Sequence, residues 1–146
     1  MNKKQWYETL FENYGLKYDD EVFTHGTIGE CDFIEKEAGY DKVEQFFVSA
    51  SEKDNNLLMT SVNFGEVYYI VLRECGQDKA LELENIIKSL PIEIVNVDMQ
   101  IAKEAARFKA KHRISYADCF TAALAKLHKG EIITGDKEFK TIESEI

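Results

Sequence analysis

Hydrophobic residues along the chain follow two patterns, helical spacing and short continuous runs. Helical spacing predicts helices at residues 5–14, 40–51, 62–74, 78–90, 98–112 and 115–130, and a short last helix through Phe139 and Ile142. Apolar runs at 57–60, 92–97 and 132–134 predict short strands, and residues 22–25 are β-prone. Because helices separate these strands and no hairpin signal occurs, we predict a layered α/β fold with a parallel sheet.

Residues that favour helix ends stand at the predicted boundaries. A small polar side chain that precedes a helix accepts a hydrogen bond from the free N–H groups of its first turn. Glycine or proline then ends the helical pattern. The expected N-caps are Ser61, Asp98 and Ser115, the expected stops are Gly76, Pro91 and Gly130, and Asp78 is expected to begin the helix at 78–90.

Length and charge narrow the class of protein. The 146 residues suit one domain. No apolar run approaches the roughly 20 residues that span a bilayer, and the first residues lack the apolar core of a signal peptide. We therefore expect a cytoplasmic protein without a membrane segment. The net charge of −9 opposes broad non-specific binding to nucleic acid, but clustered active-site carboxylates contribute to it and a bound cation would offset them.

The cysteines and histidines suggest no metal site. Cys31, Cys75 and Cys119 lie far apart, their number is odd, and no CxxC motif occurs. The three histidines also lack the spacing of metal ligands. We expect free thiols in a reducing compartment.

Three carboxylates stand where a solvated charge is not expected. Glu66 and Asp118 have apolar neighbours one helical turn away, and Asp136 follows the apolar run 132–134. Each has a structural alternative: Glu66 paired with a lysine or arginine, Asp118 in a capping box, and Asp136 as a plain N-cap. Other acids are expected on solvated faces, namely Glu82, Glu84, Glu104 and Glu143.

The three carboxylates suggest one kind of chemistry when they are taken together. In parallel α/β sheets, function lies beyond the carboxyl ends of the strands. Carboxylates that meet there repel one another, and a hard divalent cation relieves the repulsion. Mg²⁺ prefers oxygen ligands, leaves positions for water and phosphate, and stabilises in-line displacement at phosphorus. The pattern predicts a phosphodiesterase-type site.

Three segments resemble the acidic motifs of one family. Residues 60–69 around Glu66, 114–125 around Asp118 and 132–139 around Asp136 are similar to the second, third and fourth motifs of VapC-like PIN domains. The resemblance implies a three-layer α/β/α fold with a central parallel sheet over residues 38–146. It also implies RNA cleavage with Mg²⁺ or Mn²⁺, often as a toxin restrained by an antitoxin. Glu66, Asp118 and Asp136 would be the metal-site acids, with Ser61 and Thr134 as assisting hydroxyls.

The chain departs from that family at its first motif. Counting back along the resemblance, the first catalytic aspartate should fall near Gly26, which carries no ligand. Asp32 is the nearest carboxylate downstream and is the candidate substitute metal ligand; Asp19 and Asp20 are weaker ones. A further strand usually follows the region of Ile142. We therefore expect the first and last strands to be atypical or missing.

Residues 1–37 resemble a different family, the N-terminal extension of certain SAM-dependent methyltransferases. Residues 6–14 and 23–34 carry this resemblance. No glycine-rich cofactor loop follows, so no SAM binding is expected. The chain is accordingly divided into an atypical N-terminal segment, 1–37, and a PIN domain, 38–146, as in a fusion of two gene fragments.

Three functional hypotheses follow. The first is a VapC-like ribonuclease, and the second is a catalytically impaired PIN module that binds RNA or an antitoxin, because the first aspartate is absent. The third is a methyltransferase-related protein, against which the missing cofactor loop argues. A second copy of the chain is a candidate partner. One basic stretch is either a solvated helix face or a contact for the RNA backbone: Lys103, Arg107, Lys109, Lys111, His112 and Arg113.

Overall fold

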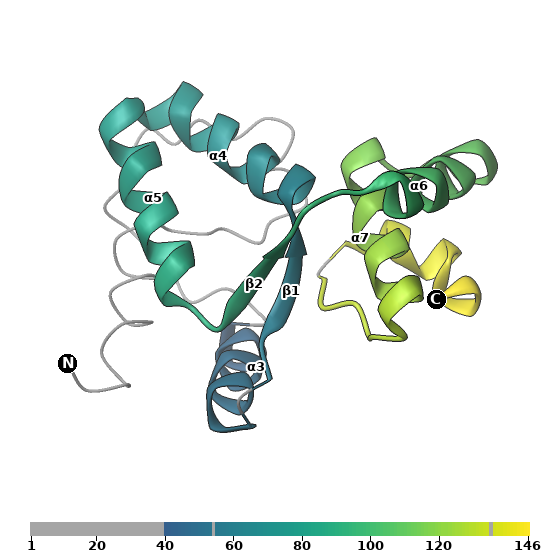
Figure 1. The fold of residues 1–146 in the computed structure, drawn as a ribbon, viewed down its shortest axis with the longest axis horizontal. Helices are drawn as coiled ribbons and strands as arrows, with labels where there is room; N and C mark the ends of the chain where they lie inside the picture. The colour runs from purple at the N-terminus through teal and green to yellow at the C-terminus, as the bar shows by residue number, and fades with distance from the viewer. Residues whose placement is uncertain (1–39, 54, 135) are drawn as a thin grey trace.

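A computed structural model describes residues 40–53, 55–134 and 136–146. Within them, helices surround a small sheet (Figure 1). The predicted helix at 5–14 and the β-prone residues 22–25 lie outside the described residues. The elements are α3 (Tyr40–Lys53), β1 (Leu57–Thr60), α4 (Ser61–Cys75), α5 (Gln77–Ser89), β2 (Ile92–Val95), α6 (Met99–Lys111) and α7 (Tyr116–His128), followed by the 3-10 helices η1 (Lys137–Thr141) and η2 (Glu143–Glu145).

The two strands are parallel, as the alternation of helices and apolar runs predicted. Leu57 lies opposite Ile92 and Thr60 lies opposite Val95. Helices α4 and α5 form the crossover between the strands, since parallel neighbours cannot be joined by a tight turn. Figure 1 shows α4 and α5 on one side of the strands and α6 and α7 on the other. The result is a mostly helical α/β fold whose described sheet is small.

Helix boundaries agree closely with the capping residues, with small corrections. Asp98 accepts a hydrogen bond from the backbone N–H of Ile101, and Ser115 accepts one from Asp118, as N-caps do. The cap of α4 is Thr60 and not Ser61, because Thr60 keeps the extended backbone and accepts the N–H of Asn63. Helix α5 begins one residue before Asp78, and the left-handed residue after α7 is Lys129 rather than Gly130.

The main core lies between α6, α7 and the C-terminal turns. Its buried side chains come from one face of α6, from most of the inner face of α7, and from η1 and the residue after it. Burial of this apolar surface is the main stabilising contribution to the fold. The cluster consists of Ile101, Ala105, Phe108, Ile114, Cys119, Phe120, Ala122, Ala123, Leu124, Phe139 and Ile142. This core holds the N-terminus of α7 and the start of η1 beside each other.

The strand expected at residues 132–134 is absent from the structure. Residues 131–134 have no regular secondary structure. Ile132 packs against the main core, whereas Ile133 is exposed and the Thr134 hydroxyl accepts the N–H of Asp136. The apolar residues at 132–134 therefore contribute side-chain packing at Ile132 and do not form a β-strand. The strand at 92–97 is also shorter than expected and ends at Val95.

Glu104 was expected on a solvated face, and the structure contradicts this. It is only 7% exposed, and its two carboxylate oxygens contact Arg107 at 2.6 Å and Lys126 at 2.9 Å. Hydrogen bonds from Lys126 and Arg107 lower the pKa of Glu104. Helical spacing could not show this burial, because α7 covers the face of α6 that carries Glu104.

Candidate metal centre

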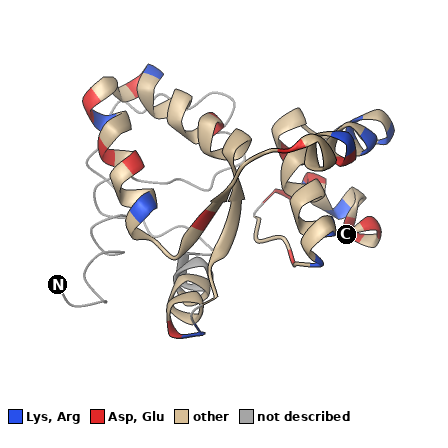
Figure 2. Ribbon diagram, in the orientation of Figure 1, with Lys and Arg blue, Asp and Glu red and all other residues tan. Residues whose placement is uncertain are grey.

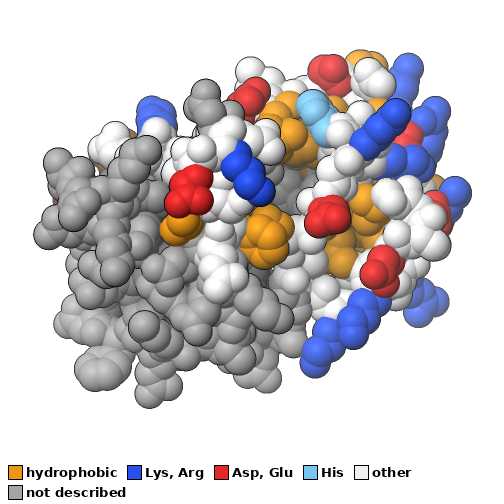
Figure 3. Space-filling model, turned by 90° about the horizontal axis from the view of Figure 1, so that it is seen from below, with side chains coloured by type: hydrophobic (Ala, Val, Ile, Leu, Met, Phe, Trp, Pro, Cys, Tyr) orange, Lys and Arg blue, Asp and Glu red, His pale blue; other side chains and the backbone are white. Residues whose placement is uncertain are grey.

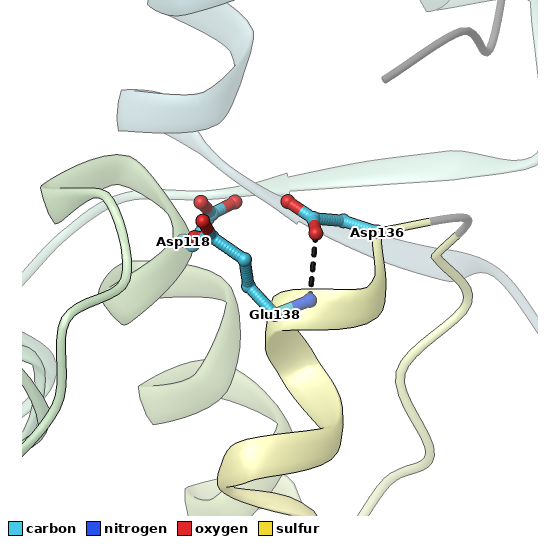
Figure 4. Close-up of side chains that lie close together, drawn as sticks. All are labelled: Asp118, Asp136 and Glu138. Carbon is cyan, nitrogen blue, oxygen red and sulfur yellow. Dashed lines mark hydrogen bonds between the residues drawn. The ribbon is translucent and has the colours of Figure 1, made fainter.

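Two chain segments bring carboxylates together at one end of the main core. Asp118 lies in the first turn of α7, and Asp136 and Glu138 lie at the start of η1. One oxygen from each of the three side chains lies within 4.8 Å of the other two. Figure 4 shows the Glu138 side chain extending toward Asp118, with the Asp136 carboxylate beside them. The structure thus joins two of the acids singled out in the sequence, Asp118 and Asp136, and adds a third.

Local hydrogen bonds orient two of these carboxylates. The Ser115 hydroxyl donates to Asp118 Oδ2 at 2.5 Å and accepts the Asp118 N–H at 3.1 Å. Asp136 Oδ1 accepts the backbone N–H of Glu138 at 2.7 Å, which makes Asp136 the N-cap of η1. The N-cap alternative for Asp136 is therefore confirmed. At the start of α7 the cap is Ser115, and Asp118 accepts the Ser115 hydroxyl, which differs from the return bond to a backbone N–H in a capping box. Each of these bonds uses one carboxylate oxygen, so the second oxygen is left for another ligand.

Glu66 lies near this cluster without joining it. Its side chain is half-buried in the second turn of α4. Burial raises the pKa of the Glu66 carboxyl, and the negative charge of Asp118 raises it further. No lysine or arginine pairs with Glu66 among residues 40–53, 55–134 and 136–146, so the ion-pair alternative is not met there. A cation nearby would favour the charged form of Glu66.

The amide of Asn63 connects the helices that carry Glu66 and Asp118. Asn63 Nδ2 donates to the backbone oxygen of Ala117 at 3.0 Å, across 54 residues of sequence. Its Oδ1 accepts from the hydroxyl of Thr60, which is 1% exposed. A buried hydroxyl needs such a partner, so Thr60, Asn63 and Ala117 form one connected set. The set holds the first turn of α4 against the first turn of α7.

The two predicted assisting hydroxyls have backbone partners. Ser61 Oγ accepts the N–H of Val97 at 3.3 Å and so ties the start of α4 to the chain after β2. Thr134 Oγ1 accepts the N–H of Asp136 at 3.0 Å. Thr134 therefore supports one carboxylate of the cluster directly. Asp32, the proposed substitute for the first aspartate, lies outside the described residues.

Glu138 was missed in the sequence. It follows Asp136 by two residues on what reads as a short solvated helix, and an acid in a first helical turn normally needs no further explanation. The available signal was the pair of acids at the start of one short helix. Asp136 is the N-cap of η1 and Glu138 lies in its first turn, so both side chains are at the same end of that short helix.

Comparison with known families identifies the family of the chain. A family model for the PIN domain matches residues 32–145. The match covers most of the chain, and the chain belongs to the PIN domain family. PIN domains are generally nucleases and typically bind divalent metal ions, so the family indicates a nuclease-type function. No curated protein and no solved structure matches the chain.

The donor set suits a hard divalent cation. All three side chains of the cluster offer carboxylate oxygens, and no sulfur or imidazole ligand joins them among the described residues. Mg²⁺ and Mn²⁺ favour such oxygen sites, whereas zinc favours histidine and cysteine. Burial, and after it the negative charge of Asp118, raises the pKa of the nearby Glu66 carboxyl. The residues present therefore fit a Mg²⁺ or Mn²⁺ ion.

None of the helices in the described part of the chain is long and apolar enough to cross a membrane.

Proposed function

We propose that this protein is a metal-dependent endoribonuclease of the VapC type. The observation that carries the proposal is the convergence of Asp118, Asp136 and Glu138 within 4.8 Å of one another, in a chain that belongs to the PIN domain family. Asp118, Asp136 and Glu66 are proposed as the catalytic acids. Asp118, Asp136 and Glu138 are proposed to bind the cation, together with Glu66 and Asp32.

The protein's own residues would prepare the site. Ser115 and the N–H of Glu138 fix one oxygen each of Asp118 and Asp136, which leaves the remaining oxygens directed toward the shared space. Fixed ligands lose little conformational freedom when an ion binds, and this favours affinity. The pKa of Glu66 is raised in the metal-free protein, and a bound cation would favour its ionised form. As a carboxylate it would complete the ligand set.

A divalent cation bound there would neutralise charge on the phosphate and would make water a better nucleophile.

The test is cleavage of a mixed RNA pool with Mg²⁺ or Mn²⁺, compared with EDTA. The Asp118→Asn variant keeps the size of the side chain and removes its charge. We expect cleavage that needs the metal and falls at least about 100-fold in this variant, a loss typical for one preorganised charge at a reaction centre. Asp78→Asn, on the exposed start of α5, is the matched control. No metal-dependent cleavage by the folded protein would contradict the proposal.

The second candidate is a catalytically impaired PIN module that binds RNA or an antitoxin. The observation in its favour is Gly26, which stands where the resemblance expects the first aspartate. Three or four carboxylates could then bind a cation too weakly for turnover. Calorimetric binding of Mn²⁺ without RNA cleavage would favour this candidate over the first.

The proposal extends to protein partners. An antitoxin that restrains the enzyme and a second copy of the chain are both proposed, with the cytoplasm as their location. Exposed apolar side chains support a docking role for the α4–α5 pair: Tyr69 and Leu72 on α4 are 48% and 38% exposed, and Leu81 on α5 is 46% exposed. Concentration-dependent mass from light scattering, measured for the wild type and for Tyr69→Ser, would test self-association.

A further inference from the structure

Basic side chains recur on one side of α6. Lys103, Arg107 and Lys111 are spaced four residues apart and are all exposed, while Ile101, Ala105 and Phe108 on the other side are buried. Residues four apart lie above one another on a helix, about 6 Å apart along its axis. Lys126 of α7 reaches the same side, since its ammonium pairs with Glu104 of α6. We call Lys103, Arg107, Lys111 and Lys126 the basic face.

This region has the opposite charge balance from the whole chain. Residues 99–129 contain 7 of the 18 lysines and arginines but only 2 of the 27 acidic residues. Figure 2 shows mostly lysine and arginine along α6, where Glu104 is the one acidic residue, whereas acidic residues outnumber basic ones on α5. Seen from below, blue side chains gather along the edge where α6 and α7 lie (Figure 3). A positive region on a protein with a net charge of −9 is a local feature that attracts polyanions.

A hollow lies within the basic face. A cavity of about 360 Å³ is lined by Arg107, Lys111 and Lys126, together with Glu104, Phe108 and Glu145. Glu104 holds Arg107 and Lys126 in place with contacts of 2.6 and 2.9 Å, and Glu145 lies 3.5 Å from Lys111. Each cation keeps further N–H donors, because a guanidinium has five and an ammonium has three. The cavity thus presents fixed donors that face solvent.

We propose that the basic face binds the phosphodiester backbone of a single RNA strand that extends away from the acidic cluster. The inference rests on the proposed function for its choice of ligand. Lys111 stands four residues before Ser115, whose hydroxyl bonds to Asp118, so the face and the cluster are joined by a short loop. Basic side chains at regular intervals follow a strand of phosphates, as in proteins that bind single strands. Arg107, Lys111 and Lys126 would hold one phosphate in the cavity, and Lys103 would hold the next.

Charge and polarity favour RNA over an acidic protein segment. Protein interfaces place aromatic or other large apolar side chains at their centres. The only large apolar side chain at the cavity is Phe108, which is 2% exposed and covered by Lys126 at 5.2 Å. Met99, the exposed large hydrophobic residue of α6, lies at its first position and outside the cavity lining. The cavity in the basic face therefore offers charged groups to a ligand and no exposed large apolar side chain.

The experiment measures binding in EDTA, where cleavage does not interfere. A fluorescein-labelled single-stranded RNA of mixed sequence is titrated with the full chain at several salt concentrations. The test variant is Lys103→Gln/Lys111→Gln, which leaves the partners of Glu104 intact. The control variant is Lys53→Gln/Lys88→Gln, which makes the same change of net charge at exposed positions on α3 and α5. Circular dichroism verifies the fold of each.

We expect the test variant to bind RNA about tenfold more weakly, with a salt slope smaller by about 1.4, because each phosphate contact to a single strand contributes about 0.7 to the slope. The control should bind like the wild type. Equal RNA affinity of the test and control variants would overturn the inference. Complete displacement of the RNA by an oligoglutamate peptide at the same concentration of charges would also overturn it, because the face would then not prefer RNA over an acidic protein segment. RNA cleavage with Mg²⁺ or Mn²⁺ is measured in a separate assay. If RNA binds through the basic face and is not cleaved, the nuclease proposal alone is rejected. If the test variant cleaves RNA like the wild type, the basic face alone is rejected.

Discussion

Asn63 on α4 donates its side-chain amide to the backbone oxygen of Ala117 on α7, at 3.0 Å. The next residue after Ala117 is Asp118, and Glu66 follows Asn63 by one helical turn. This bond therefore helps to fix the distance between the carboxyl groups of Glu66 and Asp118. Because Ala117 lies inside α7, the bond joins the side chain of α4 directly to the backbone of α7.

Replacing Asn63 with alanine should loosen the contact between α4 and α7. The loss removes one bond to Ala117 and leaves the buried Thr60 hydroxyl without its acceptor, and we expect a destabilisation of about 1–3 kcal/mol in urea unfolding. The pKa of Glu66 should also fall toward its ordinary value as Asp118 moves away, which NMR titration of the Glu66 carboxyl would detect. Asn85→Ala, on the exposed side of α5, is the control. An unchanged Glu66 pKa in Asn63→Ala would show that the bond does not hold the two acids together.

Glu66→Gln should stabilise the metal-free protein near neutral pH. A carboxyl whose folded pKa is raised binds its proton more tightly in the folded state, so ionising it at higher pH costs stability. The cost is absent below the ordinary glutamate pKa and grows as pH rises through the raised value. Thermal unfolding in EDTA from pH 4 to 8 measures it. The melting temperatures of variant and wild type should converge at pH 4 and separate above; a constant difference would contradict this origin.

Glu138→Gln should weaken metal binding without unfolding the protein. Glu138 offers one of the three clustered oxygens, but its side chain is exposed and its backbone N–H, which Asp136 accepts, is unchanged by the substitution. We expect roughly a tenfold or greater loss of Mn²⁺ affinity in calorimetry. Glu143→Gln, exposed in η2, is the matched control. Equal Mn²⁺ affinity for the Glu138 variant and the wild type would remove Glu138 from the site.

Glu104→Gln should destabilise the α6–α7 pair. It removes two charge-assisted bonds, to Arg107 and to Lys126, at a side chain that is 10% exposed. We expect the free energy of unfolding, measured with urea at pH 7, to fall by about 1.5–3 kcal/mol. The loss is modest because the freed Arg107 and Lys126 side chains can be solvated by water. The lowered pKa of Glu104 means that this contribution is present above the ordinary glutamate pKa and disappears as pH falls through the lowered value. Glu82→Gln, on the exposed side of α5, serves as the comparison, and a variant as stable as the wild type at pH 7 would count against the ion pairs.

Much of this fold follows from local patterns in the sequence. Asp98 and Ser115 cap the helices that they were expected to cap, and Pro91 follows the end of α5. These features depend on a few neighbouring residues, whose hydrogen bonds and backbone preferences act over one helical turn. The parallel pairing of β1 and β2 agrees with this pattern, because the helices between the strands are long enough to return the chain to the same end of the sheet. The sequence likewise predicted that Asp118 and Asp136 lie at the N-terminal ends of helices.

Other features arise only from contacts between distant segments. Glu138 joins Asp118 because the main core holds η1 against α7, and its spacing from Asp136 alone does not distinguish it from a solvated acid. Glu104 is buried because α7 covers it and supplies Lys126. Residues 132–134 have the composition of a strand, but a strand also requires a backbone partner, which a run of apolar residues cannot specify. The sequence by itself therefore determined the helices from α3 to α7, the caps Asp98 and Ser115 and the two helix-end aspartates, since those depend on neighbours in the chain. The tertiary structure decided which charges meet and which are buried, since those depend on distances through space.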